Sequence, residues 1–203
     1  MILEHKIIGQ SIIKYQVPFD IFTAINSFYN KNKDTLDSSN EFLIGKIKNE
    51  KTLFYSKGIK NIVPLVIIDY FKTVMKNYLK LSTLEKYKME LTSIWINEMI
   101  EHEYNPLHTH FGDAPTGLSS VMILKLPQSF GKEYSADDKP TNGKLQFIGS
   151  ASGQISETDY LPDLEERQFY IFPYDLRHSV YPFNGPGVRR TLAANMDLTR
   201  LKN

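Results

Sequence analysis

Three of the five histidines are spaced so that they can bind one metal ion. His108 and His110 lie two residues apart at the mouth of a predicted strand, so in an extended chain their side chains project from the same face. His178 comes later, directly before another apolar stretch. Three such ligands would complete one face of an octahedron and leave positions open for a cosubstrate and oxygen. We interpret His5 and His102 as surface or hydrogen-bonded core histidines.

An arginine follows the third histidine at a spacing that suits a carboxylate anchor. Arg189 comes eleven positions after His178 and opens a predicted strand. It can pair bidentately with a carboxylate several ångströms from the metal, and the hydroxyl of Thr191 shares its face of the strand. This arrangement suits a dicarboxylate that chelates the metal at its other end. Arg190 points to the opposite face, and we interpret it as a solvated or ion-paired surface arginine.

The first half of the chain, about residues 1–90, supplies mostly helical signals. Apolar residues recur at helical spacing from Phe19 to Tyr29, after Pro18, and predict one helix. A stronger amphipathic stripe runs from Ile62 to Leu79, with Asn61 as its expected cap, and predicts a second. Both stripes are interpreted as core-facing packing.

The second half, about residues 91–203, carries the pattern of a β-sheet protein. Short segments rich in aliphatic and aromatic residues predict strands at Leu91–Met99, Leu118–Leu126, Lys144–Ile148, Phe169–Phe172 and Arg190–Asn195. Two long polar stretches, Gln128–Gly143 and Gly149–Glu166, are expected to be lids or binding loops that carry the substrate determinants. Helices followed by short antiparallel strands predict a single α+β domain whose sheets form a sandwich or barrel.

Composition narrows the classes of function. The chain has 203 residues, no cysteine, and 24 basic against 23 acidic residues. Without cysteine, any metal must be bound by His, Asp or Glu. The scattered cationic residues offer no stripe for a nucleic-acid backbone, so nucleic acid is not an expected partner. The N-terminus shows no positively charged region followed by an apolar core, so no secretory signal is expected. The most apolar run, 62–68, is too short for the roughly 20 residues of a membrane span. The expected location is the cytoplasm.

At these residues the sequence resembles the iron(II)- and 2-oxoglutarate-dependent oxygenase superfamily, specifically small proteins abundant in cyanophages and marine bacteria. The resemblance covers roughly residues 90–197 and rests on several motifs in order. These are Trp95-Ile-Asn97, Asn105-Pro-Leu-His-Thr-His110, Leu118-Ser-Ser-Val-Met-Ile-Leu-Lys-Leu-Pro127, Gly143-Lys-Leu-Gln-Phe147, Phe172-Pro173 before His178-Ser-Val180, and Arg189-Arg-Thr-Leu-Ala-Ala-Asn195.

The resemblance implies a double-stranded β-helix, or jelly-roll, with supporting helices packed on one sheet. It implies a dioxygenase that uses Fe(II), 2-oxoglutarate and O2, releases succinate and CO2, and most often hydroxylates its substrate. It also implies that Arg189, Thr191 and Asn97 bind the cosubstrate. If the gene belongs to a phage, the expected location becomes the host cytoplasm. The substrate class stays open among a protein side chain such as proline, a free amino acid, a nucleobase and a small metabolite.

The chain departs from the superfamily at the first motif, where His-x-Asp or His-x-Glu is usual. With His108 as the first ligand, the carboxylate is replaced by His110, which makes the site more cationic by one charge. With His110 as the first ligand, Gly112 takes the carboxylate position, as in the halogenating members. Asp113 is an alternative ligand if the strand ends in a turn, although Gly112 and Pro115 favour a turn role for it.

Two other functions are compatible with these residues. A cupin-like three-histidine dioxygenase or isomerase would not use 2-oxoglutarate, and it would have no reason to direct Arg189 at the metal. A non-enzymatic jelly-roll binding protein would bind metal weakly or not at all, and its long loops would carry recognition.

Overall fold

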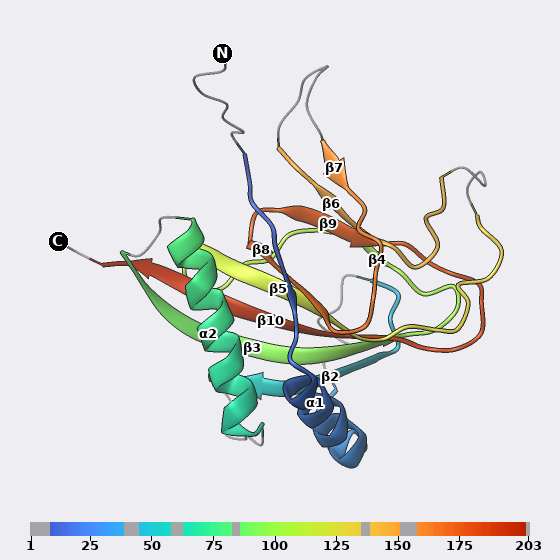
Figure 1. The fold of residues 1–203 in the computed structure, drawn as a ribbon, viewed down its shortest axis with the longest axis horizontal. Helices are drawn as coiled ribbons and strands as arrows, with labels where there is room; N and C mark the ends of the chain where they lie inside the picture. The colour runs from blue at the N-terminus through green and yellow to red at the C-terminus, as the bar shows by residue number, and fades with distance from the viewer. Residues whose placement is uncertain are drawn as a thin grey trace.

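Two antiparallel β-sheets face each other, and two helices cover the outer face of the larger sheet (Figure 1). The computed structural model describes residues 9–38, 45–57, 63–82, 86–134, 139–150 and 158–201. The larger sheet has six strands in the order β1-β8-β5-β10-β3-β2, and the smaller has four in the order β4-β9-β6-β7. The strand bounds are β1 Ile13–Gln16, β2 Asn49–Tyr55, β3 Tyr87–Met99, β4 Asn105–His108, β5 Gly117–Lys125, β6 Leu145–Ile148, β7 Asp159–Tyr160, β8 Gln168–Pro173, β9 Arg177–Val180 and β10 Arg189–Arg200.

The helices are α1 (Phe19–Asn32) and α2 (Leu65–Leu81), and each begins directly after a proline. Proline has no backbone N–H to donate, which costs nothing at a helix start. The sequence predicted that α2 would begin near Ile62, but the residue before a proline is pushed away from helical geometry, so Pro64 delays the start to Leu65. The expected cap, Asn61, lies outside the described residues.

The predicted apolar stripes of the helices form the core beneath the larger sheet, except that the first residue of the α1 stripe is exposed. In α1 the buried side chains are Ile21, Ile25 and Tyr29, whereas Phe19 is 68% exposed. In α2 the buried face contains Ile67, Ile68, Phe71, Val74, Met75, Tyr78 and Leu79. These residues pack against alternate side chains of β3, β5, β8 and β10.

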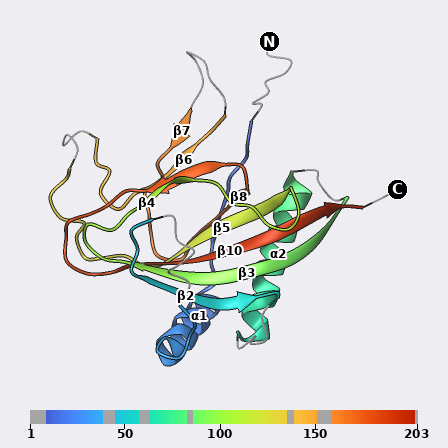
Figure 2. The same cartoon turned by 180° about the vertical axis from the view of Figure 1, so that it is seen from behind.

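Strand β10 shows how the sheet separates this core from the interior between the sheets. Its residues Leu192, Ala194 and Met196 pack on the helical side. The alternate residues Arg189 and Thr191 line a cavity on the other side. A second hydrophobic core, which includes Phe147, Phe172 and Val180, fills the rest of the space between the two sheets. Figure 2 shows the same layers from behind, with the smaller sheet on the side away from the helices.

The expected double-stranded β-helix is confirmed, and its strands β3, β5, β6, β8 and β10 match predicted segments. Strands β1 and β2 lie in the first half of the chain and were not anticipated from the sequence. They become strands by pairing with β8 and β3 at the two edges of the larger sheet. Neither described helix is long and apolar enough to cross a membrane.

Candidate metal centre and cosubstrate cavity

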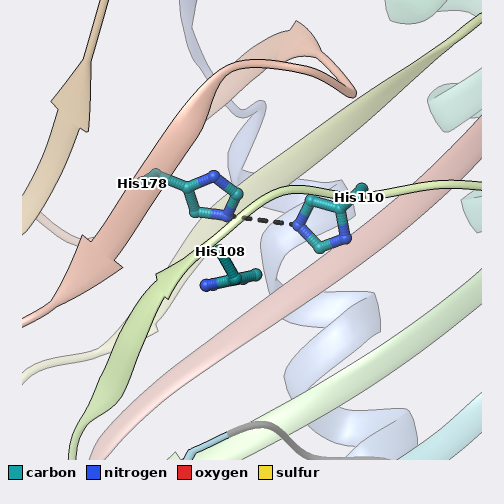
Figure 3. A group of neighbouring side chains, drawn as sticks. All are labelled: His108, His110 and His178. Atoms are coloured by element: carbon teal, nitrogen blue, oxygen red, sulfur yellow. Dashed lines mark hydrogen bonds between the residues drawn. The ribbon is translucent and has the colours of Figure 1, made fainter.

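The three predicted histidines come together between the two sheets (Figure 3). His108 ends β4 and pairs directly with His178 on β9, so the antiparallel register brings these two residues side by side. His110 lies just beyond β4, where its backbone N–H donates to the carbonyl of Tyr174 at 2.9 Å. The candidate ligand atoms of the three side chains lie within 4.8 Å of one another. One metal ion can therefore reach all three.

Backbone carbonyls orient two of the imidazoles. Nδ1 of His108 donates to the carbonyl of Pro106 at 2.8 Å, and Nδ1 of His178 donates to that of Leu176 at 2.9 Å. A carbonyl can only accept, so in the neutral rings the proton sits on Nδ1 and the Nε2 lone pair is left for a metal. Nε2 of His110 lies 3.1 Å from Nε2 of His178, as the dashed line in Figure 3 marks. The orienting contacts are those common behind metal-binding histidines.

The three histidines are neutral at pH 7. Burial lowers the pKa of His108, and burial together with the neighbouring histidines lowers the pKa of His110 well below its ordinary value. The same causes lower the pKa of His178 to about 3. Imidazoles must be deprotonated to bind a metal, so this cluster is ready to bind without first losing protons.

A cavity of about 250 Å³ extends from the histidines between the sheets. β10 contributes Arg189 and Thr191 to its wall, and β3 contributes Asn97, which is the cross-strand neighbour of Thr191. The structure thus brings the predicted cosubstrate residues and the three histidines into the lining of one cavity. At the mouth, Phe111 is 84% exposed.

Arg189 is a buried cation for which the described residues provide no ion-pair partner. Its side chain is 1% exposed, and its Nε and Nη2 atoms have no hydrogen-bond partner. Its only hydrogen bond to a described side chain runs from Nη1 to Sδ of Met99 at 4.0 Å. Burial lowers the pKa of Arg189 to about 10, so it stays charged at neutral pH. A buried charge of this kind costs several kcal/mol unless an anion pairs with it. The unsatisfied Nε and Nη2 donors of Arg189 are suited to bind the carboxylate of a bound small molecule.

Arg190 lies on the opposite face of β10, as predicted from strand alternation. It forms an ion pair with Glu98 at 2.7 Å, and its guanidinium lies 4.7 Å from the ring centre of Tyr29 on α1. The side chain is 12% exposed, so it is ion-paired and largely buried rather than solvated.

The other candidates lie away from the cluster. Asp113, the alternative ligand, forms an ion pair with Lys57 at 2.8 Å, and its side chain is 69% exposed. The cluster among the described residues that could hold a metal ion contains no carboxylate. His102 contacts the hydroxyl of Tyr134 at 2.7 Å, and His5 lies outside the described residues. No described residue of the two long polar stretches lines the cavity.

Gly112 has a structural role that sequence reasoning did not identify. A Cβ at this position would lie 1.8 Å from Oδ1 of Asp197. Asp197 is buried, and its carboxylate accepts hydrogen bonds from the backbone N–H of Ala114 at 2.9 Å and from the hydroxyl of Tyr174 at 3.0 Å. Glycine is therefore required at position 112 because Asp197 occupies the space of a side chain. Asp197 in turn holds the segment that follows His110 through its hydrogen bond with Ala114.

This contact leads to a prediction about stability. We expect Gly112→Ala to lower the free energy of unfolding by about 1–3 kcal/mol, because the methyl group overlaps a hydrogen-bonded carboxylate that cannot move freely. Gly149→Ala is the matched control, since its Cβ would lie no closer than 3.6 Å to a neighbouring atom. Urea denaturation of both variants measures the difference. Equal stabilities would contradict the packing role.

Glu50 lines the cavity and was also missed by sequence reasoning. It lies on β2, a segment that was not predicted to be a strand, and it is 5% exposed. The register places it beside Asn97 of β3. The sequence NEKTLFY does not alternate between apolar and polar residues, so it could not identify Glu50 as a buried strand residue.

Comparison with known proteins identifies the family. Residues 93–195, about half of the chain, match the family model described as "Putative 2OG-Fe(II) oxygenase". The match covers the three histidines, Arg189 and the strands that position them. The chain therefore belongs to the 2OG-Fe(II) oxygenase family, and it is an oxidoreductase that uses Fe(II) and 2-oxoglutarate. A search of curated protein sequences finds no relative of this chain.

Solved structures support the fold assignment. A prolyl-4-hydroxylase from Pseudomonas putida superposes with a TM-score of 0.58 at 12% identity, covering 96% of this chain and 94% of that one. A Trichoplax adhaerens prolyl hydroxylase in complex with a hypoxia inducible factor peptide fragment gives 0.58 at 11% identity, with 93% and 83% covered. The viral collagen prolyl hydroxylase of Paramecium Bursaria Chlorella virus-1, in its 2-oxoglutarate complex, gives 0.53 at 14% identity, with 91% and 94% covered.

Proposed function

We propose that His108, His110 and His178 bind the Fe(II) and that Arg189 binds the far carboxylate of 2-oxoglutarate. The observation that supports this most is the buried guanidinium of Arg189, whose Nε and Nη2 donors are unsatisfied in the cavity that the histidines also line. A dicarboxylate bound between the two would satisfy both the metal and the arginine. The hydroxyl of Thr191 and the amide of Asn97 are the further polar contacts in this arrangement.

The reaction of this family balances as 2-oxoglutarate plus O2 plus a C–H bond giving succinate, CO2 and a C–OH group. Fe(II) supplies the oxygen chemistry when it is bound. The protein residues bind and orient the cosubstrate, and the apolar lining from Leu145, Val121 and Val180 keeps bulk water away from it. We propose hydroxylation as the outcome.

The size of the cavity supports a small reacting group. Pockets for drug-sized ligands have volumes of about 300–1,000 Å³. This cavity, at about 250 Å³, must also hold 2-oxoglutarate. We therefore propose that one side chain or a similarly small group of the substrate enters past Phe111, while the rest stays outside. A protein side chain, an amino acid or a small metabolite can present such a group.

The test is turnover of the cosubstrate without a prime substrate. We expect the purified protein to convert 2-oxoglutarate slowly into succinate when it is given Fe(II) and O2, because uncoupled turnover needs only the metal and the cosubstrate. Succinate measured by chromatography reports the reaction, and a sample without Fe(II) is the control. Iron binding with neither 2-oxoglutarate binding nor succinate formation would instead favour the cupin-like function, which gives buried Arg189 no role.

A further inference from the structure

The proposed metal centre has one positive charge more than the usual site of its class. Non-haem Fe(II) oxygenases commonly bind the metal with two histidines and one carboxylate. In that arrangement Fe(II), the ligand carboxylate, dianionic 2-oxoglutarate and one arginine sum to zero. Here the third ligand is a neutral histidine, so Fe(II), 2-oxoglutarate and Arg189 leave a net charge of about +1 in a buried space.

A carboxylate lines the same cavity from a different strand. Glu50 is the only acidic side chain among the described residues that line it. It lies on β2, at the edge of the six-stranded sheet (Figure 1), and its neighbours across the sheet are Asn97 and then Thr191. It is not a member of the three-histidine cluster. When ionised, its carboxylate can therefore act on the site through its charge without occupying a ligand position.

Glu50 is also the lining group whose charge changes near neutral pH. Burial raises the pKa of Glu50 to about 8. The other titratable groups in the described lining are the three histidines, whose pKa values are lowered, and Arg189, which stays charged. At pH 7 Glu50 is therefore mostly protonated before a metal binds. Two added positive charges nearby would favour its ionised form.

We propose that Glu50 is the counter-charge of the three-histidine centre and takes the electrostatic part that a ligand carboxylate has elsewhere in this class. This inference rests on the proposed function, because it assumes that the three histidines bind the metal. In this role Glu50 balances the charge of the centre through space and does not coordinate the metal. It follows that loading the site with Fe(II) should release the proton of Glu50.

Proton release can be measured by anaerobic titration calorimetry of Fe(II) in two buffers of different ionisation enthalpy. With a pKa of about 8, about 0.9 of a proton sits on Glu50 at pH 7 and about 0.1 at pH 9. The unsubstituted protein should therefore release about 0.9 proton more per Fe(II) than Glu50→Gln at pH 7, and about 0.1 more at pH 9. Glu101→Gln, which removes an exposed carboxyl after β3, should behave as the unsubstituted protein does.

Affinities provide a second readout. Glu50→Gln should weaken Fe(II) binding by on the order of tenfold, because an attractive charge is lost. It should not weaken binding of 2-oxoglutarate to the Fe(II)-loaded protein, because the anionic cosubstrate loses a repulsive neighbour. Damage to the fold would weaken both. If Glu50→Gln does not fold, the fall in proton release of the unsubstituted protein between pH 7 and pH 9 tests the same proposal.

The outcomes separate this proposal from the function on which it rests. If both the unsubstituted protein and Glu50→Gln bind Fe(II) and release equal numbers of protons, the counter-charge role alone is overturned. This result is expected if Glu50 instead contacts an amine of the substrate. No Fe(II) binding by the unsubstituted protein would overturn the proposed function, and the counter-charge role with it.

Discussion

Replacing any one of His108, His110 and His178 by alanine should lower the Fe(II) affinity by more than about 100-fold. Even the loss of a residue that only orients a metal ligand commonly costs about 10–100-fold, and loss of a ligand itself should exceed this. Trp95 is the only tryptophan of the chain, and its ring centre lies 6.0 Å from that of His110. Quenching of its fluorescence by Fe(II) under anaerobic conditions therefore measures the affinity.

Asp113→Ala is the matched control for this experiment. Its carboxylate pairs with Lys57 at the surface, so its removal should leave the Fe(II) affinity near that of the unsubstituted protein. If Asp113→Ala abolished binding while His108→Ala retained it, the ligand set would be His110, Asp113 and His178. The three-histidine site would then have to be abandoned, together with the counter-charge role of Glu50.

Arg189→Ala should weaken 2-oxoglutarate binding by about 2–4 kcal/mol without weakening Fe(II) binding, because it removes charge-assisted hydrogen bonds and a positive charge but no metal ligand. Calorimetric titration of 2-oxoglutarate into the Fe(II)-loaded protein measures the loss. Arg189→Lys should give an intermediate loss, because lysine keeps the charge and cannot form the bidentate contact.

Arg190→Ala is the control on the next residue of the same strand. Arg190 faces α1 and pairs with Glu98, so its loss should lower the free energy of unfolding and leave 2-oxoglutarate affinity near that of the unsubstituted protein. If Arg190→Ala weakened 2-oxoglutarate binding and Arg189→Ala did not, the assignment of the two strand faces would be wrong.

The opposite faces of these two arginines could be predicted from the sequence because strand alternation is a local property. The side chains of consecutive strand residues point to opposite sides whatever the strand pairs with. For the same reason the sequence was sufficient to place Thr191 on the face of Arg189. It also grouped His108 with His110, although β4 ends at His108 and His110 lies just beyond the strand. The long helical stripe of α2 is local in the same sense, although Pro64 shifted its start to Leu65.

Features that depend on pairing between distant segments could be decided only by the tertiary structure. The meeting of His178 with His108 depends on the register of β4 against β9. Gly112 is explained by Asp197, which lies far along the chain on β10. Glu50 enters the cavity because β2 pairs with β3, and its raised pKa comes from the burial that this pairing produces. The sequence determined which residues could bind a metal and a dicarboxylate, whereas long-range strand pairing decided the cavity around them and its charge.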